Sequence, residues 1–308
     1  MLSMFEFLTR RHAVPAETPL SEVRFTREDL FVLLGGFDTG MFANGPYSTD
    51  LSAIERYGAG PWRRDMAARL SPTGLVDAEG TPSDELAEAL SPLNKPGIVI
   101  DDGSSPQSAQ ERDSRTVSAV FYKGSGAVIR RLPGRRSGFA VIPLDSEENW
   151  DASFRNLIDC PPLDPSWKGS TVYGPEDRAL GDAMLRGDEA RLRAVCRYGG
   201  DVDALCEFSV ALASNSGMLR GMREFIVADY RGSNFDTSLG FSIPQASAPS
   251  CWVKTARVFP TCGVVLNGMK VPNSEDPDGY IGYSAIDFCN SGTLIDALFR
   301  FHPRPEGL

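Results

Sequence analysis

Histidine is scarce in this sequence: the 308 residues contain two, His12 and His302. Histidine is the side chain that most often moves protons near neutral pH, so a Ser-His-Asp or Cys-His centre would have to recruit one of these two. Both lie near the ends of the sequence, and we expect both to be solvent-exposed. The scarcity argues against a catalytic centre that depends on histidine, and no catalytic residue is assigned.

Closely spaced cysteines are missing as well. The six cysteines form no CxxC pair and show no spacing typical of metal ligands; they are Cys160, Cys196, Cys206, Cys251, Cys262 and Cys289. Zinc sites are built from closely spaced Cys and His, which this sequence does not offer. We therefore expect buried free thiols, no metal site and no cofactor.

Long apolar runs and an excess of basic residues are also absent. No apolar run approaches the roughly 20 residues that span a bilayer. In the N-terminal MLSMFEFLTRRH the arginines follow the apolar run, the reverse of a secretory signal. The 31 Lys and Arg against 41 Asp and Glu give a net charge of −10, which disfavours a nucleic-acid partner. The one dense basic group, RRLPGRR (130–136), is typical of a solvated hairpin tip. We expect a cytoplasmic globular protein without membrane insertion.

Two short segments look like catalytic motifs but lack the rest of the motif. GFDTG (36–40) contains the Asp-Thr-Gly of aspartic proteases, but that chemistry needs two carboxylates that share a proton, and FDTS (235–238) lacks the glycine. KGSGA (123–127) has no third glycine and no following helix, so it indicates a hairpin turn instead of a phosphate loop. Acidic residues are plentiful without any one pair standing out, and a glycosidase-like carboxylate pair stays open.

Periodicity and capping residues predict the elements of the first half. TREDLFVLL predicts a helix that Thr26 caps, with Asp29 three positions later. Thr81 as cap, followed by Pro82 and Asp84, predicts the start of another helix. The β-type runs that follow are PGIVI, TVSAVFYKG, GAVIRRL and GFAVIPL. A closing helix is predicted by the apolar stripe of Trp150, Phe154, Leu157 and Ile158.

The same order of elements recurs after a Pro-rich break near Pro161. Helical patterns cover 174–198 and 201–214, the β-type runs include REFIVADY, CWVKTARVF, GVVLNG and GYIGYSAI, and CNSGTLIDALFRF closes as a helix. Aligned without gaps, 137–158 and 278–299 share glycine at 138 and 279, asparagine at 149 and 290, and leucine at 157 and 298. We therefore predict an α+β fold with a pseudo-two-fold repeat, in which a central antiparallel β-sheet is flanked by helices and helical bundles. The halves are 20–160 and 161–308; we favour one compact quasi-symmetric unit, and two separate domains stay open.

A long connection lies between the first two predicted strands. A tight hairpin needs about two to five residues, whereas DDGSSPQSAQERDSR (101–115) spends fifteen. Its composition is polar and free of aromatic residues, as in a solvated surface loop. A second long connection, RGSNFDTSLG, follows the corresponding strand of the other half, so a long loop at this point belongs to the architecture.

Three segments recur together in one known family. GLVDAEGTPSDELAEALSPLNKPGIVI, FTREDLFVLL and PSCWVKTARVFPTCGVVL are similar to the turn-helix-strand entry, the opening helix and the Ser-Trp-x-Asp-Thr strand of the EspG proteins. These are cytosolic chaperones of type VII (ESX) secretion in actinobacteria. Trp252 and Thr255 match the strand motif, whereas Lys254 stands where an acidic residue is usual, and the Gly-Arg pair that follows in the family is missing. The resemblance spans about residues 20–300.

The resemblance implies a quasi-two-fold sheet and a non-enzymatic protein that binds one tip of a helical substrate, keeping it soluble and secretion-competent. The substrate would be a PE/PPE-like heterodimer or another ESX protein. The resemblance places partner contacts in the loop between the first long strands, in the central sheet and in the C-terminal helical part. The polar loop residues expected to take part are Ser104, Ser105, Gln107, Gln110, Glu111 and Arg112.

An exposed apolar helix tip also needs apolar anchors, which the loop does not contain. Phe121 and Tyr122 are candidates because strand alternation turns one of them away from the core. The C-terminal candidates are Ile295, Phe299 and Phe301. Two other functions stay open: a hydrolase with a carboxylate pair in a cleft between the halves, and an immunity-type module that binds a toxin.

Overall fold

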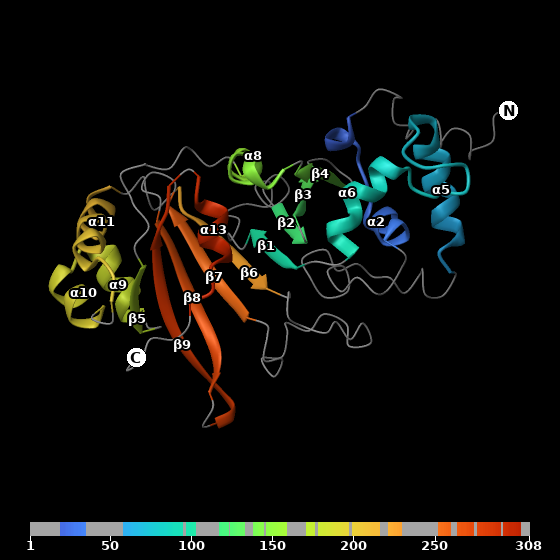
Figure 1. Ribbon diagram of the computed structural model, residues 1–308. Coiled ribbons are helices and arrows are strands. Elements are labelled where there is room, and N and C mark those ends of the chain that lie inside the picture. The colour runs from blue at the N-terminus through green and yellow to red at the C-terminus, as the bar shows by residue number, and fades with distance from the viewer. Residues whose placement is uncertain are drawn as a thin grey trace. The chain divides into compact units, whose positions relative to one another are not determined.

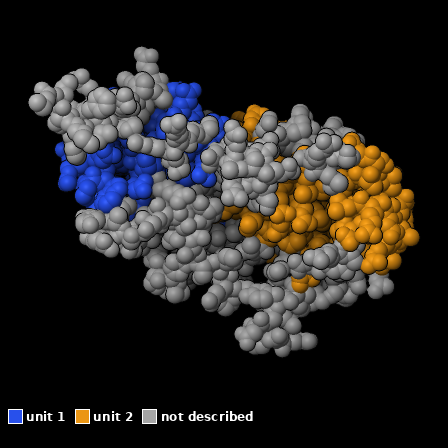
Figure 2. Space-filling model, turned by 180° about the vertical axis from the view of Figure 1, so that it is seen from behind, with its two compact units in different colours: residues 1–97, 106–147, 234–243 blue, residues 98–105, 148–233, 244–308 orange. Residues whose placement is uncertain are grey.

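The computed structural model describes residues 19–34, 58–94, 97–102, 117–122, 124–132, 138–144, 146–158, 171–175, 178–196, 199–215, 221–229, 252–259, 264–273, 276–290 and 292–302. The chain divides into two compact units (Figure 2). Unit 1 consists of residues 1–97, 106–147 and 234–243, and unit 2 consists of residues 98–105, 148–233 and 244–308.

Unit 1 contains an antiparallel meander of three strands, β2 (Val117–Tyr122), β3 (Ser125–Leu132) and β4 (Gly138–Leu144). Gly124 lies in the turn between β2 and β3 with a φ of +82°, a conformation that glycine adopts without steric cost. The prediction of a hairpin turn in KGSGA is therefore confirmed. Helix α6 (Asp84–Asn94) packs on all three strands, because its leucines at 86, 90 and 93 share one buried face.

The first helix of unit 1, α2 (Arg27–Leu33), begins with the predicted cap. Thr26 Oγ1 accepts from the backbone N–H of Asp29 at 3.1 Å, and Asp29 Oδ2 accepts from that of Thr26 at 2.7 Å. Arg69 of α5 (Gly60–Leu70) forms an ion pair with the buried Asp29 and donates to the carbonyl of Arg24. The short 3₁₀ turns of this unit are η1 (Leu20–Glu22) and η2 (Ser71–Thr73).

The cap predicted for α6 is wrong by two residues. Ser83 caps the helix, since its Oγ accepts from the backbone N–H of Leu86 at 3.3 Å. Thr81 instead closes a turn, in which its backbone N–H donates to Asp77 Oδ1 at 2.7 Å. Both Thr81 and Ser83 are residue types that cap helices. Because the backbone of Thr81 belongs to the turn at Asp77, Ser83 is the residue at the cap position.

Unit 2 contains an antiparallel sheet in the order β1-β6-β7-β8-β9-β5 (Figure 1). Its strands are β1 (Ile98–Asp102), β5 (Thr171–Pro175), β6 (Arg223–Asp229), β7 (Trp252–Phe259), β8 (Val264–Asn273) and β9 (Asp276–Phe288). The sequence did not predict β5, which pairs with β9 through Tyr173 and Ala285. The other five strands lie where β-type runs were predicted.

Three helices pack together beside β5: α9 (Arg178–Arg186), α10 (Glu189–Val195) and α11 (Val202–Ser214) (Figure 1). Their apolar residues form one core with Phe259 and Ile286 of the sheet, and the ring centroids of Phe208 and Phe259 lie 5.4 Å apart. Residues of opposite parity on the same strands, such as Ala256 of β7 and Ala285 of β9, are buried as well. Both faces of this part of the sheet are therefore covered.

The remaining helices of unit 2 are η3 (Glu147–Asn149), α8 (Trp150–Leu157) and α13 (Leu294–Phe299). The predicted stripe of α8 is buried at Trp150, Phe154 and Ile158, and the ring centroids of Phe154 and Phe225 lie 5.7 Å apart. Asp151 of α8 accepts from the backbone N–H of Ile295 at 2.6 Å and so caps α13.

The predicted α+β class with antiparallel strands is confirmed. The predicted order of strand, long connection, meander and helix is present as β1, β2-β3-β4 and α8, and again as β6, β7-β8-β9 and α13. The pseudo-two-fold relation between the halves stays a prediction, as does their boundary near residue 160. Within the described part of the chain, no helix combines the length and the apolar character needed to span a membrane.

Candidate functional site

A buried polar cluster lies where the C-terminal residues meet the sheet of unit 2. Its centre is Asp287 of β9, whose side chain is fully buried. Three side chains donate to this carboxylate: His302 Nε2 at 2.6 Å, Asn267 Nδ2 at 3.3 Å and Arg300 Nη1 at 3.5 Å. A buried carboxylate needs such donors because it has lost its hydration. We call this group, together with Tyr173 and Tyr283, the Asp287 cluster.

The expectation that His302 is solvent-exposed is wrong. Its side chain is 4% exposed, and both nitrogens have partners: Nε2 faces Asp287, and Nδ1 lies 3.4 Å from the hydroxyl of Tyr173. The Tyr283 hydroxyl also donates to the backbone carbonyl of His302. A nearby chain end suggests exposure, but the buried carboxylate fifteen positions upstream binds the imidazole and buries it. His12 lies outside the described residues.

The Asp287 cluster resembles an Asp-His-hydroxyl relay in its connectivity. Burial first, and then the Asp287 charge, raise the pKa of Tyr173, so its phenol stays protonated and serves as a donor. The contacts fit the Nε2–H tautomer of His302, with Nε2 donating to Asp287 and the Tyr173 hydroxyl donating to Nδ1. The Asp287 carboxylate and both nitrogens of His302 thereby have partners within the chain, and the arrangement holds the C-terminal residues in place.

Lys254 has a similar structural task. Its side chain is buried, and Nζ donates to the carbonyls of Ala297 at 3.3 Å and Arg300 at 2.9 Å. The last carbonyls of a helix need donors from outside the helix, and Lys254 supplies them at the end of α13. This position is where the sequence departs from the acidic residue of the EspG strand motif.

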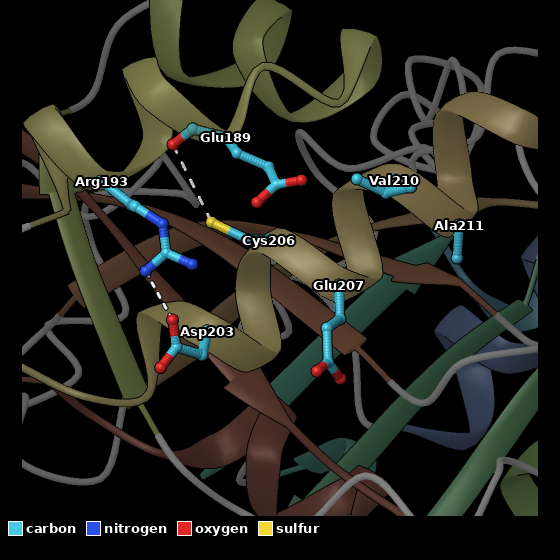
Figure 3. Close-up of a pocket in the computed structure, with 7 residues that line it drawn as sticks. All are labelled: Glu189, Arg193, Asp203, Cys206, Glu207, Val210 and Ala211. Atoms are coloured by element: carbon cyan, nitrogen blue, oxygen red, sulfur yellow. Dashed lines mark hydrogen bonds and ion pairs between the residues drawn. The ribbon is translucent and has the colours of Figure 1, made fainter.

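A groove of about 620 Å³ lies between α10 and α11 (Figure 3). We call it the α10–α11 groove; it is lined by Glu189, Arg193, Asp203, Cys206, Glu207, Val210 and Ala211. Arg193 Nη1 and Asp203 Oδ1, 2.5 Å apart, join the two helices. Figure 3 shows the thiol of Cys206 directed at the backbone oxygen of Glu189, 3.9 Å away. The groove combines carboxylates with an apolar wall, since Val210 is 43% exposed.

The thiols of this region are buried and inert. Burial raises the pKa of Cys196 to about 12 and also raises the pKa of Cys206, which favours the neutral thiol over the reactive thiolate. Cys289 is buried and free as well. The expectation of buried free thiols is confirmed for these three, and the other three cysteines lie outside the described residues.

The predicted partner-binding residues fall into two groups. The loop residues Ser104, Ser105, Gln107, Gln110, Glu111 and Arg112 lie outside the described residues. Phe121 is 3% exposed and packs by Gly126, and Ile295 is 4% exposed, so neither is an exposed anchor. Phe121 belongs to the buried core, and Ile295 lies on the buried face of α13. Phe299 is half-buried, and Tyr122 lies in β2; both stay predictions.

Phe301, a C-terminal candidate, is 46% exposed, whereas the sequence reasoning missed three other exposed apolar side chains. Leu185 of α9 and Val210 of α11 are 40% and 43% exposed, and Ile226 of β6 is 47% exposed. The buried stripe of α11 is formed by Leu205, Phe208 and Leu212, and Val210 lies outside it. This departure from the helical period was the sequence signal that Val210 is exposed.

Asp38 of GFDTG and Asp236 of FDTS lie outside the described residues. Among the residues that are described, no three His, Cys, Asp or Glu side chains are placed to hold a metal ion. In comparisons with known proteins, neither a family model nor a curated protein matches this chain.

Proposed function

We propose that this protein is a non-enzymatic chaperone of a type VII (ESX) secretion system. It binds a helical substrate, a PE/PPE-like protein or another ESX protein, in the cytoplasm and keeps it soluble and secretion-competent. The proposal rests on the EspG-like segments of the sequence together with the arrangement of strands and helices.

The order of elements around the first long connection carries the proposal. Strand β1 ends at Asp102 and β2 begins at Val117, so fourteen residues (103–116) join them. An antiparallel meander and α8 follow, as the EspG resemblance implies. A connection this long exceeds what joining the strands requires and can carry a recognition function.

Exposed apolar side chains supply the other half of a chaperone surface. Ile226 lies in the sheet of unit 2, and Val210 lines the α10–α11 groove. The EspG resemblance places partner contacts on the central sheet, where Ile226 lies; the α10–α11 groove is an additional candidate surface of this chain. Apolar anchors with polar side chains at the rim suit reversible binding of an apolar helix tip.

Replacement of the loop tests the proposal. In a variant, Ser104–Ser114 would be exchanged for a Gly/Ser linker of equal length and co-expressed with a helical ESX substrate pair. We expect co-purification of the substrate to be lost and the melting temperature to stay nearly unchanged, because the exchange keeps the chain length and removes only loop side chains. Affinity capture with mass spectrometry measures the first, and differential scanning fluorimetry the second.

The matched control is Asp182→Asn on α9, which changes an exposed side chain outside both the loop and the α10–α11 groove and should leave co-purification of the substrate unchanged. If the linker variant retains the substrate at the wild-type level, the loop is not the recognition element. If neither the wild-type protein nor the variants retain any helical ESX substrate, the proposed function itself is wrong.

A further inference from the structure

We infer that the C-terminal segment Arg300–His302 is a polar latch on unit 2, which opens without unfolding of the sheet beneath it. Helix α13 ends at Phe299, and at Arg300 the backbone becomes extended, with φ −62° and ψ 122°. From this point the chain leaves the apolar core of α13 and runs onto the Asp287 cluster.

Polar contacts hold the latch. The Arg300 carbonyl accepts from Lys254 Nζ at 2.9 Å, and the His302 carbonyl accepts from the Tyr283 hydroxyl. The side chains of His302 and Arg300 both donate to Asp287. These four hydrogen bonds and ion pairs tie the segment Arg300–His302 to the sheet.

Apolar burial contributes little to the latch. Phe301, its one large apolar side chain, is 46% exposed, and the side chain of Arg300 is 43% exposed. Residues Leu294 and Leu298 of α13, immediately before it, are fully buried. On opening, hydrogen bonds are exchanged for hydrogen bonds to water, whereas buried apolar surface has no such substitute. The latch therefore opens at lower cost than α13.

The surface beneath the latch suits an open state. Asp287, Tyr283 and Asn267 are polar residues on one face of β8 and β9, and water can satisfy them when the latch lifts. Asn267 Oδ1 is buried and has no hydrogen-bond partner among the described residues, so opening supplies one. Lys254 keeps its bond to the Ala297 carbonyl, so α13 retains a cap in the open state.

Limited proteolysis of the full-length protein with trypsin tests the latch. Trypsin must bind an extended segment on both sides of the bond after Arg300, and the contacts of Arg300 and His302 prevent this until the latch opens. Arg304 is followed by Pro305, a bond that trypsin does not cleave. In Asp287→Asn the shape is kept and the charge that attracts His302 and Arg300 is removed. We expect cleavage after Arg300 to be at least about tenfold faster than in the wild type, which corresponds to about 1.4 kcal/mol. Mass spectrometry identifies the product that ends at Arg300.

The control is Glu224→Gln, which removes an ion pair elsewhere on the same sheet, between Glu224 Oε2 and Arg257 Nε at 2.8 Å. In this variant we expect cleavage after Arg300 to be no faster than in the wild type. Equal cleavage rates in Asp287→Asn and the wild type would overturn the latch.

Urea dependence in the wild-type protein gives a second measurement that needs no variant. Local opening exposes little surface, so cleavage after Arg300 should change little with sub-denaturing urea, while cleavage within the strands at Arg223 and Arg257 should rise steeply. The latch is excluded if cleavage after Arg300 rises as steeply as cleavage within the strands.

Discussion

Buried and half-buried charged residues of this chain hold helix ends. Asp29 completes the cap of α2, Lys254 donates to the last carbonyls of α13, and Arg223 Nη1 donates to the Ile158 carbonyl after α8 at 2.7 Å. Each of these side chains meets a backbone group that a helix leaves unpaired. The hydrogen bonds therefore give each of these charged side chains a structural contact at a helix end.

The cap of α2 gives a prediction at this scale. In Thr26→Ala the side-chain acceptor for the Asp29 N–H is lost, and we expect the free energy of unfolding to fall by about 1 kcal/mol. Thr26→Ser keeps the hydroxyl and should lie close to the wild type. Urea unfolding followed by circular dichroism measures both, and equal stability of the alanine and serine variants would show that the cap does not contribute.

Residues close together in the sequence predicted α2. The burial of single side chains depended instead on residues far away in the sequence. The Thr26–Asp29 capping box is separated by three positions and was readable in advance. His302 is buried by Asp287 and Tyr173, which belong to two different strands, and no local pattern shows this. Strand alternation predicted that Phe121 and Tyr122 point to opposite faces, but alternation alone did not show that Phe121 lies in the core.

At the scale of elements, the sequence predicted helices and strands correctly where the apolar pattern extends over many residues. It failed where the pattern covers only a few residues. Strands β6, β7 and β9 and helix α11 have clear patterns. Strand β5 is TVYGP, whose glycine and proline signal a turn, and it becomes a strand because β9 offers a free edge for pairing. The candidate groove depends on the packing of α10 against α11, which the patterns of the separate helices do not contain.

Helix α13 depends on a neighbouring element for its N-terminus. It has six residues, and Thr293 makes no side-chain cap; Asp151 of α8 accepts from the Ile295 N–H instead. Asp151→Ala should destabilise unit 2 by about 1 kcal/mol through the loss of this cap, whereas Asp151→Asn keeps an acceptor and should have a smaller effect. Hydrogen exchange at Ile295 measures the local effect. Unchanged protection of this amide in Asp151→Ala would contradict the role of α8 as the cap donor.

At the scale of the whole molecule, the pH dependence of stability follows from the carboxylates whose pKa differs between the folded and unfolded states. Burial raises the pKa of Asp29 above 3.8, although the Arg69 guanidinium opposes the shift. Hydrogen bonds from the backbone, first that of Thr81, lower the pKa of the exposed Asp77 below 3.8. The two carboxylates therefore affect the pH dependence of unfolding with opposite signs.

The sign for each carboxylate follows from proton binding. Folded Asp29 holds its proton at pH values where the unfolded chain has released it, so its stabilising contribution is full below pH 3.8 and is lost as the pH rises through the folded pKa. The contribution of Asp77 is full above pH 3.8 and is lost as the pH falls through its lowered pKa.

In urea unfolding at a series of pH values, the stability of the wild type relative to Asp29→Asn should fall as the pH rises above 3.8. Relative to Asp77→Asn it should fall as the pH drops below 3.8. Parallel curves for the wild type and Asp29→Asn would mean that burial does not govern this carboxylate, and that Arg69 compensates fully for its lost hydration.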